Sequence, residues 1–251
     1  MKSVRTALRV FEEVAARQPV GLSELSRRLD VPKASVQRAL TTLADAGWLR
    51  HDVSAPGSWV VTARFSVLAD ASPEVIAARD AARPVLSSLR EKLDGSPGFF
   101  VLDGDRMVLL AGPEETLLRT LSATQGPLPV HLSAAGRAIL ARLPDAKVDE
   151  VLERSLPHTS DGTGEVLERH VRQSVDDARR DGYSLVRGEY VDALGVVAAA
   201  VVDGHGAPVA ALAVMVPRDR IDRGEGPELG AHLVDAAETV SLAVQAAEGR
   251  R

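Results

Sequence analysis

The sequence contains no cysteine among its 251 residues, and this absence removes several kinds of chemistry at once. Disulfide bonds, thiolate nucleophiles and cysteine-ligated metal sites are excluded, and such a composition is ordinary for a protein of the cytosol. Aromatic residues are also scarce, at 3% of the chain, although 45% of the residues are hydrophobic. Any buried core must therefore be built mainly from alanine, valine and leucine.

Long apolar runs are missing as well. The longest, residues 193–202, spans ten residues, whereas a membrane-spanning helix needs about 20. The N-terminal stretch carries Glu12 and Glu13 and has no continuous apolar core of the kind found in secretory signal peptides. We therefore expect a cytoplasmic protein with no membrane partner.

The sequence also lacks the signatures of common enzyme sites. Its six histidines are scattered and show no HxxxH or HExxH spacing, and no GxSxG elbow, Walker loop or GxGxxG fingerprint is present. Ser133, which lies close to His131, is better explained as the N-cap of a helix than as a nucleophile. We therefore predict that the protein is not an enzyme and has no cofactor or metal site.

The charge is unevenly divided along the chain. The net charge is −5, but residues 1–68 hold ten Lys and Arg against six Asp and Glu, a net of +4, and the remainder holds twenty against twenty-nine, a net of −9. A basic end on an acidic body suits a small DNA-binding domain joined to a domain that does not touch DNA. Chance clustering could give the same difference, so charge alone does not decide the point.

The basic part has the element order of a winged helix-turn-helix, which we place at residues 1–66. A second short helix is predicted from about Ser23 as its N-cap, and a third over residues 35–46, after Pro32. Two β-rich runs, 48–51 and 59–62, flank a Pro-Gly turn and predict a hairpin. The first helix is predicted from apolar residues at spacings of three and four, expected to face inward: Val4, Leu8, Phe11, Val14 and Ala15.

The third helix presents a polar face that lacks acids until Asp45. Glutamine can pair with adenine, arginine with guanine, and serine or threonine with either base or phosphate. For a lone helix an ordinary solvated face would be the better interpretation, but the preceding helix and turn and the following wing favour DNA. The residues expected to read DNA are Lys33, Ser35, Gln37, Arg38, Thr41 and Thr42. Phosphate contacts are expected from Arg5, Arg50, His51 and Arg64.

The rest of the chain predicts an α+β domain. A helix is predicted over residues 73–93, and Pro84 is expected to kink it or divide it in two. We interpret this helix as the main part of a linker at 67–94. Its Ala/Leu stripe is a candidate dimer contact. Beyond it, in 95–251, helices are predicted at about 133–143, 145–155, 165–181 and 226–247. Hairpins around Asp103-Gly104 and Asp203-Gly204, together with a short strand at 184–187, indicate an antiparallel sheet.

Three segments together resemble the IclR family of bacterial regulators: LSELSRRLDVPKASVQRALTTLADAGWLR (22–50), PLPVHLSAAGRAILARLP (127–144) and RRDGYSLVRGEYVDALGVVAAAVVDGHGAPVAALAVMVP (179–217). The resemblance implies a GAF-like effector-binding and oligomerisation domain over 95–251. It also implies a homodimer or dimer of dimers on operator DNA, with a small organic effector that adjusts the affinity. Pocket-lining positions of the family fall here on Ala134, Ala135, Gly188, Val196, Ala198, Ala213 and Met215.

These pocket positions depart from the family's pattern. Related proteins often place an acid, a cysteine and serines where this chain has Gly188, Ala198, Ala213 and Met215. A small carboxylate would find few partners there, and an unpaired buried charge costs several kcal/mol. We therefore expect a larger, fairly apolar or aromatic-type effector, with Arg119 either holding a carboxylate or lying on the surface. The alternative is a ligand-independent DNA-binding protein whose C-terminal domain serves only oligomerisation.

Overall fold

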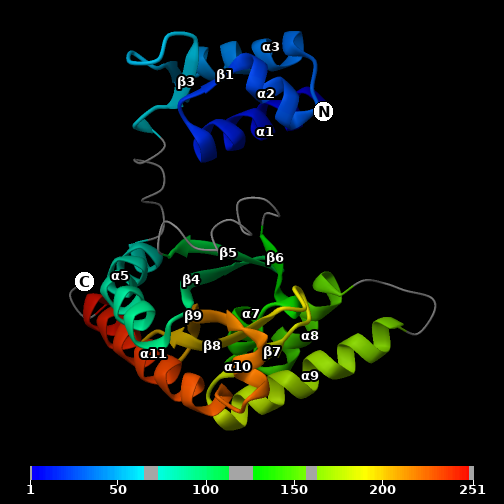
Figure 1. Ribbon diagram of the computed structural model, residues 1–251, viewed down its shortest axis with the longest axis vertical. Helices are drawn as coiled ribbons and strands as arrows, with labels where there is room; N and C mark the ends of the chain where they lie inside the picture. Colours follow the sequence, from blue (N-terminus) through cyan, green and yellow to red (C-terminus); the bar gives the residue numbers. More distant parts are fainter. Residues whose placement is uncertain (1, 65–72, 113–126, 157–162, 249–251) are drawn as a thin grey trace. The chain divides into compact units, whose positions relative to one another are not determined.

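The computed structural model describes residues 2–64, 73–112, 127–156 and 163–248. The chain divides into two compact units, residues 1–72 and 73–251 (Figure 1). No helix in the described ranges is both long enough and apolar enough to cross a membrane.

The first unit is the predicted winged helix-turn-helix. Its three helices are α1 (Lys2–Arg17), α2 (Leu22–Leu29) and α3 (Lys33–Asp45). Its antiparallel sheet has the order β1-β3-β2, with β1 at Val20–Gly21, β2 at Leu49–His51 and β3 at Ser58–Val61. The sequence did not indicate β1, because two residues are too few to show an alternating pattern.

Two details of the first unit correct the sequence analysis. Val14 is buried as predicted, but Val4 and Leu8 are 64% and 56% exposed, and Val10, which was not among the predicted residues, is fully buried. Spacings of three and four residues fit two neighbouring faces of this helix, and packing against α2 and α3 selects the one that contains Val10 and Val14. Ser23 is not an N-cap, because α2 begins at Leu22 and no side chain caps it.

The helix that carries the polar face, α3, starts directly after Pro32 and ends at Asp45. Val36 and Leu40 are fully buried in the core of the first unit, which fixes the opposite side of the helix outward. After the helix, Gly47 has a φ of +79°, a conformation that glycine adopts without strain. The chain can therefore reverse there and enter β2.

The second unit is built on a six-stranded antiparallel sheet, as the predicted α+β fold requires. The strand order is β6-β5-β4-β9-β8-β7. The strands are β4 (Ser96–Asp103), β5 (Arg106–Ala111), β6 (Leu128–Pro129), β7 (Ser184–Arg187), β8 (Leu194–Val202) and β9 (Pro208–Pro217). The two expected hairpins are confirmed as β4–β5 and β8–β9.

Helices cover both faces of this sheet. On one face lie α5 (Pro73–Leu93) and α11 (Gly226–Glu248) (Figure 1). On the other face lie the 3₁₀ turn η1 (Val130–Leu132), α7 (Ala134–Leu140), α8 (Asp145–Ser155) and α9 (Thr163–Asp181). The short helix α10 (Arg218–Asp222) follows β9. The alternation of β8 divides its side chains between the two cores. Val197, Ala199 and Val201 face α5 and α11, whereas Ala198 faces α7.

The helix α5 differs from its interpretation as a divided segment with a free apolar stripe. It continues as one helix through Pro84. Its stripe is buried within the second unit, against α11 and the sheet, and is therefore not available as a dimer contact. The stripe consists of Ala78, Ala82, Leu86, Leu89 and Leu93. An apolar stripe shows that a helix packs on something, but the sequence does not show whether the partner belongs to the same chain.

Candidate functional site

The polar face of α3 is presented to solvent in the first unit. Gln37 and Arg38 are exposed and make only local contacts, Gln37 Nε2 to Thr41 Oγ1 at 3.4 Å and Arg38 Nη2 to Ser35 Oγ at 3.1 Å. Thr42 is exposed too, and its hydroxyl donates to the main-chain oxygen of Arg38. Lys33 is exposed at the start of the helix. The structure therefore brings all six predicted reading residues onto one helix with their donors and acceptors within reach of a ligand.

The residues predicted to contact phosphate are not equivalent. Arg5 on α1 and Arg50 on β2 are exposed. Arg64 is exposed as well, but it also makes contacts within the first unit, since its Nη1 donates to the main-chain oxygen of Ala46 at 2.8 Å and its guanidinium lies 5.1 Å from the centre of the Trp48 ring. This cation–π contact and hydrogen bond tie the chain after β3 to the end of α3, so Arg64 supports the wing.

Six of the seven predicted pocket positions gather on one face of the sheet in the second unit. The register of β8 and β9 pairs Val196 with Met215 and Ala198 with Ala213, and directly paired residues share a face. Ala134 and Ala135 lie at the start of α7, which packs on this face. We call these six residues the sheet-face cluster: Ala134, Ala135, Val196, Ala198, Ala213 and Met215.

The seventh position, Gly188, lies in the turn after β7 and has a backbone reason to be glycine. Its φ is +71°, and a Cβ there would approach the main-chain oxygen of Asp192 to 3.0 Å. An acid at this position would be strained, so its absence says little about the ligand. Arg119 lies outside the described residues.

An ion pair beside this turn, between a fully buried arginine and a partly exposed glutamate, was not predicted from the sequence. Arg137 of α7 is fully buried, and its Nη1 donates to Glu189 Oε1 at 2.9 Å while Nη2 donates to the second carboxylate oxygen. Its Nε donates to the main-chain oxygen of His131 at 2.9 Å. The residue after Gly188 therefore supplies an acid that the sequence analysis judged missing. The available signal was one arginine inside the apolar run 134–141.

The ion pair extends into a wider polar network. Ser174 of α9 accepts from Arg137 at 3.3 Å, and His170 of the same helix lies 3.1 Å from Glu189 Oε1. Burial raises the pKa of the Glu189 carboxyl, but the hydrogen bond and charge of Arg137, aided by His170, outweigh burial and hold this pKa below its usual range. Glu189 is therefore ionised at neutral pH, and the network joins α7, α9 and the turn after β7.

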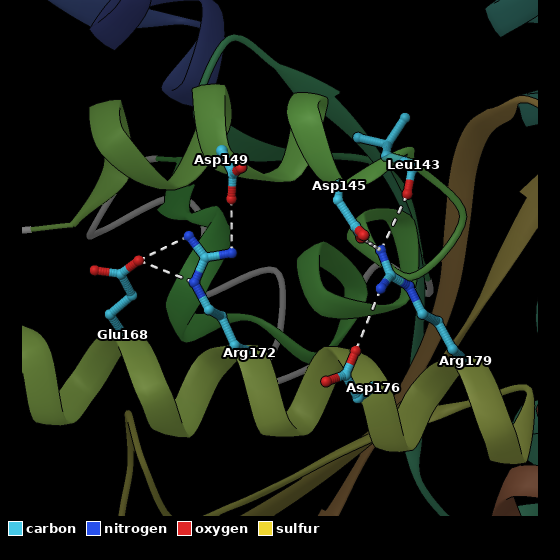
Figure 2. Close-up of polar contacts among 7 residues, drawn as sticks. All are labelled: Leu143, Asp145, Asp149, Glu168, Arg172, Asp176 and Arg179. Atoms are coloured by element: carbon cyan, nitrogen blue, oxygen red, sulfur yellow. Dashed lines mark hydrogen bonds and ion pairs between the residues drawn. The ribbon is translucent and has the colours of Figure 1, made fainter.

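Two arginines of α9 bind the neighbouring helix α8 and the segment between α7 and α8 (Figure 2). Arg172 Nη1 lies 2.7 Å from Asp149 Oδ1 of α8. Arg179 Nη2 lies 2.8 Å from Asp145 Oδ1 and donates to the main-chain oxygen of Leu143 at 3.2 Å. Exposed ion pairs of this kind contribute about 0–1 kcal/mol each, so they orient helices that the apolar core already holds.

Acid should weaken the second unit through His131. Burial, followed by the charge of Arg137, lowers the pKa of this 4% exposed histidine below its usual 6.5. Below pH 6.5 the unfolded chain therefore binds a proton at His131 that the folded chain does not, and the free energy of unfolding falls as the pH falls. We expect urea denaturation between pH 7.5 and 5.5 to show a smaller loss in His131→Asn than in the parent. The exposed His205, replaced by asparagine, is the control. Equal losses in all three proteins would contradict the assignment.

In the part of the chain that the structure describes, no three histidine, aspartate or glutamate side chains are grouped to hold a metal ion.

Comparisons with known proteins match both units of the chain. Residues 3–53 match the family model for the IclR helix-turn-helix domain, and residues 74–242 match the model for the bacterial transcriptional regulator IclR C-terminal domain. Over 247 residues the chain is 29% identical to the acetate operon repressor of Salmonella typhimurium and 28% identical to the transcriptional repressor IclR of Escherichia coli. Each alignment covers 97% of this chain and 90% of the relative.

Solved structures share the fold along nearly the whole chain. An IclR homologue from Microbacterium hydrocarbonoxydans, complexed with 4-hydroxybenzoate, matches with a TM-score of 0.71 at 23% identity, over 97% of this chain and 99% of that one. The IclR protein of Thermotoga maritima matches with a TM-score of 0.68 at 17% identity, over the same shares. At these identities the likeness concerns the fold.

Proposed function

The chain belongs to the IclR family of bacterial transcriptional regulators, and from this premise we propose which function each of its two units has. It is a DNA-binding regulator with an effector-binding C-terminal domain. In our proposal α3 reads the operator, and a fairly apolar or aromatic-type metabolite bound against the sheet-face cluster adjusts the affinity for DNA.

The proposal for DNA rests on the exposed polar face of α3. In helix-turn-helix proteins the N-terminal residues of the recognition helix reach base edges in the major groove. We assign base contacts to Gln37 and Arg38, whose side chains are exposed and only weakly engaged along the helix. Arg5 and Arg50 are assigned to phosphates, which position a domain without reading sequence. Base or phosphate contacts are assigned to Lys33, Ser35, Thr41 and Thr42.

Replacing Arg38 with alanine should weaken operator binding and relax the choice of sequence. Loss of a bidentate arginine–guanine contact costs about 1–3 kcal/mol, or roughly 5- to 150-fold in affinity. Fluorescence anisotropy with the protein's own promoter fragment and a scrambled duplex, at one salt concentration, measures both effects. Arg17→Ala is the matched control, because Arg17 is exposed at the end of α1 and pairs with Glu13 at 2.8 Å. An unchanged operator affinity in Arg38→Ala removes this residue from the reading set.

The proposal for the effector rests on the composition of the sheet-face cluster. Its six side chains are apolar, come from three elements and lie on one face of the sheet. The homologue complexed with 4-hydroxybenzoate is a relative in which the ligand is an aromatic acid. A thermal-shift screen of aromatic acids, lactones and hydroxy acids tests the proposal, because a ligand that binds the folded state raises the melting temperature.

The second candidate function has a C-terminal domain that only assembles subunits. The lack of charged side chains in the sheet-face cluster favours it, and a broad screen without a hit would support it. In either case we propose a homodimer or dimer of dimers, which predicts a palindromic footprint with half-sites about 34 Å apart or a multiple of that spacing. Because the stripe of α5 is buried, the contact between subunits must use another surface.

A further inference from the structure

One buried polar group in the second unit is left without a partner. Ser184 of β7 is 1% exposed, and its hydroxyl is the one buried side-chain group that lacks a hydrogen bond among the described residues. Leaving such a group unpaired in the protein interior is unfavourable, because the hydroxyl has lost its hydrogen bonds to water. An unpaired buried hydroxyl in a folded protein calls for an explanation, such as a missing ligand.

The strand register places this hydroxyl beside the sheet-face cluster. Ser184 pairs directly with Ala198 on β8, and Ala198 pairs with Ala213 on β9, so the three side chains form a row across the same face. Leu185, the next residue of β7, packs with the core on the opposite face. Val186, two residues along, returns to the face of Ser184 and belongs to its core.

We propose that Ser184 is an effector-binding residue, and that its hydroxyl exchanges a hydrogen bond with a hydroxyl group of an otherwise apolar ligand lying over Ala198 and Ala213. This inference rests on the proposed effector site. A ligand hydroxyl suits Ser184 because each group can both donate and accept. The other two members of the row, Ala198 and Ala213, carry small apolar side chains.

The partner group of Ser184 must be neutral. The residues that flank it on this face, Val186 and Ala198, carry no polar side chain, and one hydroxyl does not offset the burial of a charge. The nearby buried cation, Arg137 of α7, is already neutralised by Glu189. A carboxylate on the ligand must therefore point away from Ser184.

Ser241 offers a matched control for a purely structural role. It is a buried serine, 5% exposed, on α11 at the opposite face of the sheet. Its hydroxyl donates to the main-chain oxygen of Ala237 at 2.8 Å and accepts from the main-chain nitrogen of Val202 at 2.9 Å. Removal of this hydroxyl leaves the main-chain N–H of Val202 without its acceptor. Removal of the Ser184 hydroxyl leaves no described group without a hydrogen bond.

The test compares full-length Ser184→Ala and Ser241→Ala with the parent protein. Melting temperatures are measured without ligand, and dissociation constants are measured for two probe pairs that differ by one hydroxyl: 4-hydroxybenzoate with benzoate, and 4-hydroxyphenylacetate with phenylacetate. We expect Ser184→Ala to melt no lower than the parent. It should bind the hydroxylated probes about tenfold more weakly and the other probes within about twofold, as one hydrogen bond implies. Ser241→Ala should melt lower and bind all four probes as the parent does.

Each other outcome overturns the inference in a distinguishable way. If Ser184→Ala melts as low as Ser241→Ala, the hydroxyl serves the fold. If it binds both members of each pair as the parent does, Ser184 is not a contact although the effector site stands. If no probe raises the melting temperature of the parent, the proposed effector function fails for this ligand class and the inference fails with it.

Discussion

Replacing Arg137 with methionine is expected to lower the free energy of unfolding of the second unit by about 1.5–3 kcal/mol, the usual range for hydrogen bonds to a charged group. The substitution leaves Glu189, whose side chain is 22% exposed, without its main counter-charge, and His170 remains as a contact of this carboxylate. It also removes the donor to the main-chain oxygen of His131. Methionine fills most of the space, so the loss is electrostatic rather than a cavity effect.

A double-mutant cycle separates the ion pair from other effects of the substitution. Glu189→Gln in the Arg137→Met background removes the carboxylate charge that has lost its arginine partner. The double variant should therefore be more stable than the sum of the two single losses predicts. Lys147→Met is the control, because its pair with Glu150 is exposed and should contribute less than about 1 kcal/mol. Additive losses in the cycle would show that the two side chains do not act as a pair.

The chain offers separate optical signals for these measurements. Both tryptophans, Trp48 and Trp59, lie in the first unit, and both tyrosines, Tyr183 and Tyr190, lie in the second. Tryptophan fluorescence, excited where tyrosine does not absorb, therefore reports on the first unit, and far-UV circular dichroism reports on both units. Arg137→Met should shift the part of the circular dichroism transition that does not coincide with the tryptophan transition, and leave the tryptophan transition in place.

Replacing Gly136 with alanine is expected to destabilise the second unit by about 3 kcal/mol. A Cβ at this position would lie 2.3 Å from the main-chain oxygen of Val130 and 2.7 Å from its Cγ2. Alanine is the better helix former by about 1 kcal/mol, so propensity alone predicts the opposite sign. The steric effect dominates because η1 is packed directly against α7 and its backbone cannot move aside without disturbing the core.

The same substitution in a Val130→Ala background shows which atom is responsible. Val130→Ala removes the Cγ2 contact but not the nearer contact with the main-chain oxygen, so the loss caused by Gly136→Ala should persist in that background. Far-UV circular dichroism in urea, compared with tryptophan fluorescence of the first unit, gives both values. A Gly136→Ala protein within about 0.5 kcal/mol of the parent, the range of an ordinary surface change, would show that η1 can shift away.

The helices and hairpins of this protein could be predicted from local patterns. Ser133 before an apolar run indicated the start of a helix, and its hydroxyl does accept from the main-chain nitrogen of Gly136 at 3.3 Å. The Asp-Gly dipeptides at 103–104 and 203–204 indicated hairpins that the structure contains. Such signals depend on residues close together in the chain, which is why a single sequence reveals them.

Errors arose where one pattern was compatible with two partners. Val4 and Leu8 share the predicted face of α1 with Val14, and only the packing of α1 against the other helices shows that Val14 is buried together with Val10 while Val4 and Leu8 are exposed. The apolar stripe of α5 could have met a second subunit, but it covers the sheet of its own unit. In both cases the periodicity states that a face is buried and leaves the partner undetermined.

By itself the sequence determined the winged helix, the α+β class of the second unit and the polar face of α3 from Lys33 to Thr42, because these follow from periodicity, turn residues and charge along a continuous stretch of chain. The lack of cysteine and the scarcity of aromatic residues likewise predicted cores built mainly from alanine, valine and leucine. Only the tertiary structure decided what lies around the sheet-face cluster. Arg137 meets Glu189 across 52 positions, and Ser184 meets Ala198 through a strand register that no local pattern encodes.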